Sequence, residues 1–212
     1  MKRAFQRSVC GGLVLALAGL FCVVGLASDP TFVIPEGLPV LKGPILFTSC
    51  GQAPGALTVA LICQVEVTPP IAGDSQEPDL ITADELAAKS KDGPAYGALF
   101  VTTGTSLKGM GAAGVDVDSE VARCTALIAK AKELGIFVIV GQVEGPARRT
   151  DETDEQSIRS MSPLADLLIT RSDVNWDGYF TTLAEEKKIP QIFIEKELDL
   201  KFLMPLLFPP AS

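Results

Sequence analysis

Residues 97–140 read GALFVTTGTSLKGMGAAGVDVDSEVARCTALIAKAKELGIFVIV, and this stretch decides the fold class. A short apolar run, Gly97 to Thr102, precedes a glycine-rich segment, a long amphipathic segment from Ser119 to Leu134, and a second apolar run from Ile136 to Val140. Apolar residues recur at helical spacing in the amphipathic segment, and Gly135 ends it. Short apolar runs with few polar residues are typical of strands buried on both faces. The stretch therefore predicts a strand, a helix and a second strand parallel to the first.

The same alternation extends along the chain in both directions. Further strands are predicted at Ile45–Thr48, Leu167–Thr170 and Gln191–Ile194. Further helices are predicted at Ala56–Val65, Ala83–Lys89, Glu155–Met161, Gly178–Lys188 and Leu198–Phe208. The proline-rich segment Thr68–Pro78 is expected to be a surface excursion. With right-handed crossovers, this order predicts a single three-layer α/β domain around a mostly parallel sheet of about five strands, Rossmann-like or flavodoxin-like.

The N-terminus has the order of a secretory signal peptide. Basic residues precede the apolar stretch Gly11 to Leu26, and the small residue Ala27 follows it. Cleavage near Ala27/Ser28 predicts a periplasmic or secreted protein that has left the membrane, and an uncleaved membrane anchor is the alternative. Residues 28–43, rich in proline, then form an extended lead-in, and residues 44–212 form the domain.

Composition excludes several functions. The formal charge is −8, and the signal peptide contains three basic and no acidic residues, so its removal leaves −11. This charge argues against nucleic acid and anionic membranes as partners. The chain has no histidine, which excludes Ser-His-Asp triads, Cys-His pairs and histidine-ligated zinc. A non-catalytic role is therefore favoured, although an enzyme is not excluded.

Three cysteines remain after the signal peptide, so at most one pair can form within the chain. Cys63 and Cys124 lie on apolar helical faces and are expected to be buried. Cys50 follows the first strand in a predicted loop. It is either reactive or merely small, and we expect it to be the first of the three to be labelled by a thiol reagent.

Ligands of open parallel sheets bind beyond the carboxyl ends of the strands, so the loops there are the candidate site. The loop Gly104–Gly114 contains several glycines and Lys108, a combination that favours an anion held by backbone N–H groups and one positive charge. A tight strand-to-helix connection is the alternative. The following acids, Asp116, Asp118 and Glu120, resemble a metal cluster, but helix capping explains them without an ion.

Two other loops carry polar residues. Arg148 and Arg149 follow the third long strand and either clamp a carboxylate or phosphate or pair with nearby acids. After the fourth, Asn175 and Asp177 are suited to turn the chain and cap the next helix, while Trp176 is suited either to wall a pocket or to pack in the core. The candidate ligand-binding residues are Cys50, Gly51, Gln52, Gly104, Thr105, Ser106, Lys108, Gly109, Gln142, Arg148, Arg149, Asn175 and Asp177.

These loops resemble an uncharacterised family of exported bacterial proteins, the domain of unknown function numbered six-three-zero-five. The resemblance covers about residues 41 to 195 and rests on the Thr48–Gln52 run, the Gly104–Gly114 run, the arginine pair and the Asn175–Phe180 turn. The specific part is Lys108–Gly114. It implies a similar sheet and similar loops, with no established activity. One departure lies before the arginines, where the resemblance leads us to expect His-x-Gly-Gly and this chain has Gln142-Val-Glu-Gly145.

Three functions follow from these observations. The first is a non-catalytic module that binds a small anion or carboxylate and serves a transporter or sensor protein. The second is an electron carrier or enzyme that holds flavin mononucleotide by its phosphate, because Val101–Ser106 partly resembles a flavodoxin phosphate loop. The third is an interaction adaptor with an acidic surface. No other cofactor is indicated.

Overall fold

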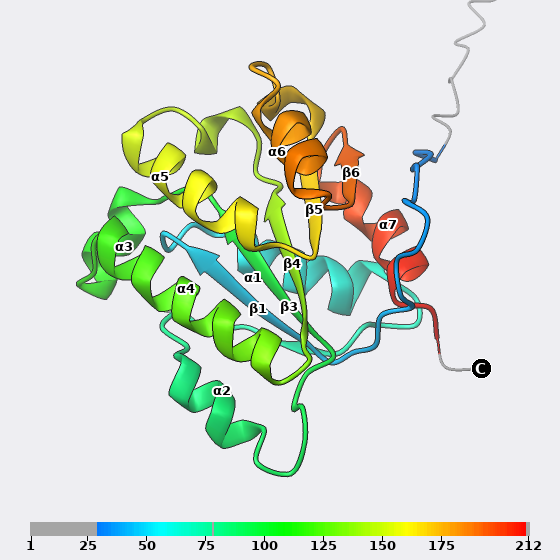
Figure 1. Cartoon of the computed structure of the whole chain (residues 1–212), viewed down its shortest axis with the longest axis horizontal. Coiled ribbons are helices and arrows are strands. Elements are labelled where there is room, and N and C mark those ends of the chain that lie inside the picture. The colour runs from blue at the N-terminus through cyan, green and yellow to red at the C-terminus, as the bar shows by residue number, and fades with distance from the viewer. Residues whose placement is uncertain (1–28, 78, 211–212) are drawn as a thin grey trace, which may run out of the picture.

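The computed structural model describes residues 29–77 and 79–210, so the predicted signal peptide, residues 1–27, lies outside the described residues. Six parallel strands form one sheet (Figure 1). They are β1 (Ile45–Cys50), β2 (Gly73–Asp74), β3 (Ala98–Thr103), β4 (Phe137–Gln142), β5 (Leu167–Arg171) and β6 (Gln191–Ile194). All five predicted strands are present. The sixth, β2, is a two-residue edge strand within the segment predicted as a surface excursion.

The helices are α1 (Gly55–Leu61), α2 (Ala83–Lys89), α3 (Leu107–Ala113), α4 (Val117–Glu133), α5 (Glu152–Met161), α6 (Tyr179–Lys187) and α7 (Leu200–Leu207). A π-helical turn, Ile62–Glu66, continues α1. Short 3₁₀ turns lie at Pro146–Arg148, Ser162–Leu164, Ser172–Val174 and Glu197–Asp199.

One element corrects the prediction, because α3 lies inside the glycine-rich segment expected to be a loop. The Ser106 side chain accepts a hydrogen bond from Gly109 N at 3.1 Å and so caps the helix. Only the two ends of the segment, Gly104 and Gly114, have a positive φ, at 100° and 70°. The intervening glycines are helical, so the freedom that glycine gives the backbone is used at the ends.

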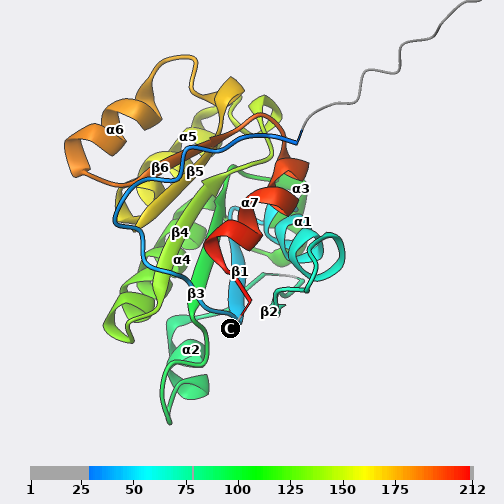
Figure 2. The ribbon, with the colours of Figure 1, turned by 90° about the vertical axis from the view of Figure 1, so that its right-hand side faces the viewer.

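Helices cover both faces of the sheet. The π-helical turn, α1 and α7 share one apolar cluster with the lead-in residue Leu41, while α2, α4 and α6 pack in a second cluster on the opposite face. Figure 2 shows α1 and α7 on one side of the strands. Every residue of β1 and β3 is buried, as expected of parallel strands covered on both faces. The lead-in forms no helix and is fixed at its end by a hydrogen bond from Leu41 N to Leu207 O, 3.0 Å. Among the described residues, no helix is long and apolar enough to cross a membrane.

The strand order β2-β1-β3-β4-β5-β6 reverses direction between β1 and β3. The chain moves outward from β1 to β2, then crosses back to β3 and continues the other way. This switch point is where doubly wound folds place their ligands. The register pairs Cys50 with Thr103, and a bridge joins Gln52 to Thr105, so the loops after β1 and β3 lie side by side.

The three cysteines of the domain are free and buried. The burial predicted for Cys63 and Cys124 is confirmed, and burial raises the pKa of the Cys63 thiol to about 12. The exposure expected of Cys50 is wrong. Strand β1 continues two residues beyond its predicted end, which places this side chain in the same apolar cluster as Cys124.

Candidate functional site

A cavity of about 410 Å³ opens at the switch point. The start of α1, the segment after β2 and helix α3 form its walls, and the end of β1 forms its floor. We call it the switch-point cavity. Its lining residues are Ser49, Gln52, Ala53, Pro54, Ala56, Leu57, Gln76, Glu77, Asp79, Gly109, Ala112 and Ala113.

Gln52 organises the floor of this cavity. Its φ is 54°, a left-handed conformation that is uncommon outside glycine and clusters at functional sites. Its side-chain amide donates to Asp79 O at 2.5 Å and to Glu120 Oε2 at 3.0 Å, and its side-chain oxygen accepts from Asp79 N at 3.0 Å. Gln52 therefore joins the segment after β2 to helix α4, and its conformation is fixed by both.

Two buried carboxylates accept hydrogen bonds from backbone amides at the end of β1. Glu120, which is fully buried, accepts from Gly51 N at 3.0 Å, and Asp79 accepts from Ser49 N. Arg123 lies against both, with Nε 2.9 Å from Glu120 Oε1 and Nη1 3.9 Å from Asp79 Oδ1. Burial raises the pKa of Asp79, and the Arg123 charge opposes that shift. This buried cluster carries two acids and one base.

Neighbouring loops repeat the arrangement. Asp154 accepts from Thr105 N at 2.7 Å and from Thr150 N at 2.9 Å, and Glu144 accepts from Gly55 N at 3.0 Å. Among the backbone amides expected to hold an anion, that of Gly104 donates to Ser157 Oγ at 3.2 Å, and those of Gly51 and Thr105 are bonded to carboxylates of the protein itself. An anion would have to displace a side-chain carboxylate from them, which argues against an amide cradle at this edge.

The arginine pair forms ion pairs instead of a clamp. Arg148 Nε lies 3.2 Å from Glu144 Oε2, and its Nη1 donates to Thr105 O at 2.9 Å. The side chain of Arg149 is 1% exposed. Its five N–H groups donate to Glu155 (2.6 and 3.4 Å), to Asp177 (2.9 and 2.7 Å) and to Val174 O (2.5 Å). No donor of Arg149 is left for a ligand, and we remove this residue from the candidate site.

Three further candidates also hold the loops together. Gln142 is buried and bonds Gly145 N, Gly145 O and Arg148 O, which fixes the turn after β4. Asn175 accepts from Phe180 N at 3.0 Å, and Asp177 accepts from Tyr179 N at 3.1 Å, so both support the start of α6 as the turn-and-cap hypothesis proposed. None of these three residues lines the switch-point cavity.

Gly109 lies at this cavity, whereas Lys108, the residue before it in α3, is not part of the lining. A Cβ on Gly109 would collide with Gln52 O, so close packing of α3 on the floor requires glycine. Lys108, the preceding residue, is exposed and forms no ion pair with the described part of the chain. Its place in α3, next to the lining residue Gly109, is all that relates this charge to the cavity.

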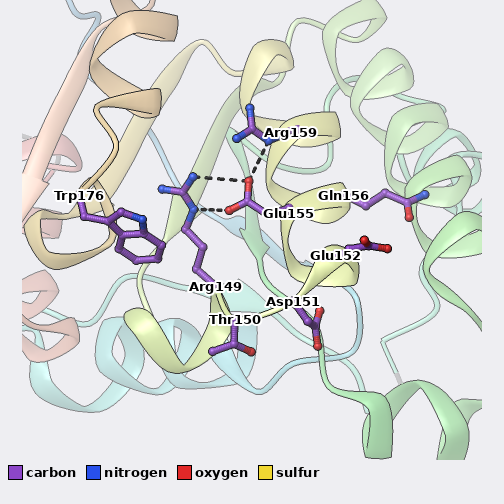
Figure 3. A pocket seen from close by; sticks show the side chains of 8 residues that line it. All are labelled: Arg149, Thr150, Asp151, Glu152, Glu155, Gln156, Arg159 and Trp176. Atoms are coloured by element: carbon purple, nitrogen blue, oxygen red, sulfur yellow. Dashed lines mark hydrogen bonds and ion pairs between the residues drawn. The ribbon is translucent and has the colours of Figure 1, made fainter.

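A second cavity lies beside Trp176, in the loop after β5. Trp176 is 60% exposed, so the core-packing alternative is wrong. It lines an open cavity of about 540 Å³, which we call the Trp176 cavity (Figure 3). The other lining residues are Arg149, Thr150, Asp151, Glu152, Glu155, Gln156 and Arg159.

The predicted capping role of Asp116 is confirmed. Its side chain accepts from Ser119 N at 2.8 Å and starts α4. Asp118 instead accepts from Gln156 on α5 at 2.6 Å, and Glu120 turns into the buried cluster. Within residues 29–77 and 79–210, no three acidic or cysteine side chains are arranged to bind a metal ion.

Glu197 gives a pH-dependence that can be tested. Burial, followed by the nearby Glu144 charge, raises its pKa to about 7, against the partial effect of Arg171. Because the folded state binds this proton more tightly, the free energy of unfolding should fall as the pH rises from the ordinary value of 4.5 to about 7. Glu197→Gln should match the wild-type melting temperature near pH 4 and exceed it near pH 8. Melting curves that stay parallel across this range would contradict the assignment.

The fold and the cavity define a doubly wound parallel α/β domain with a cavity at its switch point, polar at the floor formed by Ser49, Gln52 and Asp79. The chain belongs to the family described as domain of unknown function DUF6305, whose match covers residues 42–208. This match includes α7, beyond the end of the resemblance seen in the sequence. No curated protein and no solved structure matches the chain.

Proposed function

We propose that this chain is an exported small-ligand-binding domain and that its ligand occupies the switch-point cavity. The observation that carries the proposal is the cavity itself. It lies at the strand reversal, and its floor is fixed before any ligand arrives by the hydrogen bonds of Gln52, Asp79 and Glu120. A pre-formed polar floor favours affinity, because little conformational entropy is lost on binding.

A binding role fits this cavity better than catalysis. Asp79 is the buried acid in its lining, and its two carboxylate oxygens accept from Thr48 Oγ1 at 2.8 Å and from Ser49 N. Arg123 also lies beside it. Because both of its oxygens are already hydrogen-bonded, this carboxylate is better suited to hold the loops together than to accept a proton from a substrate. The absence of histidine from the sequence removes the commonest partner for a nucleophile.

The charges in the lining restrict the ligand. The exposed Glu77 and the buried Asp79 both line the cavity and repel an anion there, whereas Lys108, next to the lining residue Gly109, favours one near α3. We therefore propose a small polar ligand whose carboxylate or other anionic group, if it has one, lies beside Lys108. The flavin alternative receives less support, because the amides of Gly104, Thr105 and Ser106 in that loop already donate to groups of the protein itself. A transporter or sensor that receives the ligand remains part of the proposal.

The test is a melting screen of amino acids, mono- and dicarboxylates, phosphates and nucleotides. A ligand at about a hundred times its Kd should stabilise the wild type by about 2.7 kcal/mol. Ala112→Phe fills the cavity from the exposed surface of α3 and should abolish the shift. Ala129→Phe, at an exposed position of α4, is the matched control and should retain it.

A second pair of variants tests the charge of Lys108. Lys108→Ala should weaken the binding of anionic ligands and leave the binding of neutral ones unchanged. Lys91→Ala is the control, because it removes the same charge from an exposed lysine that follows α2. A ligand that shifts Ala112→Phe and wild type equally would show that binding occurs elsewhere. A screen without any shift would favour the adaptor.

A further inference from the structure

We propose that the Trp176 cavity is a second binding site and that it takes an uncharged carbohydrate. Trp176 exposes 60% of its surface, more than a large aromatic side chain without a partner normally does. It stands at a cavity of about 540 Å³, within the size range of small-molecule sites and large enough for one or two sugar rings. This site shares no lining residue with the switch-point cavity and goes beyond the function proposed for it.

The guanidinium group of Arg149 packs against the Trp176 indole and is itself fixed by ion pairs. The guanidinium carbon of Arg149 lies 4.6 Å from the centre of the indole ring, and an ion pair with Glu155 holds that guanidinium (Figure 3). A second ion pair, with Asp177, also fixes it. The indole is therefore pre-oriented, and a ligand that stacks on it orders little additional side chain. A sugar ring offers a face of C–H groups that packs on an exposed aromatic surface, while its hydroxyls point to the sides.

The rim of the cavity supplies partners for hydroxyl groups. Thr150, just before α5, and Glu152 and Gln156, in its first turns, line it. Gln156 donates its amide to Asp118 at 2.6 Å, which leaves its side-chain oxygen as an acceptor held in place. A mixture of hydroxyl, carboxylate and amide groups around an aromatic ring matches the alternating donors and acceptors of a sugar.

The charges at the site argue against charged ligands. Its two arginines face three acids, Asp151, Glu152 and Glu155, and every N–H group of Arg149 is bonded within the protein. An anion therefore meets a net negative lining, while a cation that stacks on the indole meets the Arg149 guanidinium, 4.6 Å from the ring centre. The second arginine, Arg159, pairs with Glu155 at 2.8 Å, which reduces its pull on an anion.

Tryptophan fluorescence gives a direct test, because Trp176 is the single tryptophan of the sequence. Glucose, N-acetylglucosamine, maltose and cellobiose are titrated into the full protein, with inorganic phosphate and choline as charged comparisons. At least one neutral sugar should change the emission in a saturable way, and calorimetry should give the same Kd. Phosphate and choline should produce no saturable change.

Variants separate the site from an unspecific effect. Trp176→Ala should weaken sugar binding at least about tenfold by calorimetry, Trp176→Phe should lose less, and Gln156→Ala should weaken it several-fold. Phe193→Ala, at another exposed aromatic on β6, is the matched control and should bind as wild type does. The proposal is overturned if no sugar binds, if phosphate or choline binds in preference, or if a folded Trp176→Ala keeps wild-type affinity. None of these outcomes depends on the switch-point cavity.

Discussion

Replacing Glu120 with alanine is expected to lower the free energy of unfolding by about 3–5 kcal/mol, the cost of removing one partner from a buried ion pair. Glu120 is fully buried and accepts hydrogen bonds from Gly51 N, the Gln52 amide and two nitrogens of Arg123. Without it, the Arg123 side chain, 10% exposed, would keep Asp79 at 3.9 Å as its nearest acid. Two donors would also lose their acceptor.

Urea unfolding of Glu120→Ala, Glu120→Gln and Glu133→Ala measures this effect. Glu120→Gln retains the shape and one acceptor oxygen and should lose less. Glu133 lies on the same helix, and its side chain is 67% exposed where it pairs with Lys130. Its removal should cost less than about 1 kcal/mol. Equal losses in Glu120→Ala and Glu133→Ala would show that the buried cluster contributes little.

Arg149→Ala should lower the free energy of unfolding by about 3 kcal/mol, the lower end of the range for a buried pair. The side chain of Arg149 is 1% exposed, whereas those of Glu155 and Asp177 are 31% and 36% exposed, so water can partly solvate the two acids left behind. What cannot be replaced is the hydrogen bond to Val174 O and the packing of the guanidinium on Trp176.

Two variants set the scale for Arg149. Arg149→Lys keeps the charge but cannot bond two carboxylates in parallel, and it should fall between wild type and alanine. Arg159→Ala removes a neighbouring arginine that also pairs with Glu155 but is 53% exposed, and it should cost less than about 1 kcal/mol. Chemical denaturation of the three proteins decides the matter. Similar values for the two alanine variants would contradict the structural role given to Arg149.

The sheet could be predicted because its strands are buried on both faces and are therefore apolar runs in the sequence. The errors lie at the strand ends and in the glycine-rich segment. The apolar run predicts a strand that ends at Thr48 and leaves Cys50 in a loop, yet the β1–β3 register continues to the pair Cys50 and Thr103. Helix α3 was not predicted because glycine lowers helix propensity. In the structure, the close packing of Gly109 on Gln52 decides the conformation of this segment.

The buried carboxylates of the site were harder to predict. One signal was available for Glu120, which stands four and seven residues before Cys124 and Leu127 and thus on the buried face of α4. Nothing local identified Asp79, whose partner Gln52 is 27 residues away, or separated the half-buried Arg148 from the buried Arg149. Such assignments depend on which loops the sheet brings together, and sequence spacing does not contain that information.

Carboxylates of the chain itself accept the hydrogen bonds of several loop amides at the carboxyl edge of the sheet. Asp79, Glu120, Glu144 and Asp154 act as internal counter-ions at the edge where other doubly wound folds receive a phosphate from a cofactor. The loops are thus assembled by groups carried in the chain itself. The conformations of the loops at that edge are therefore fixed by hydrogen bonds within the domain.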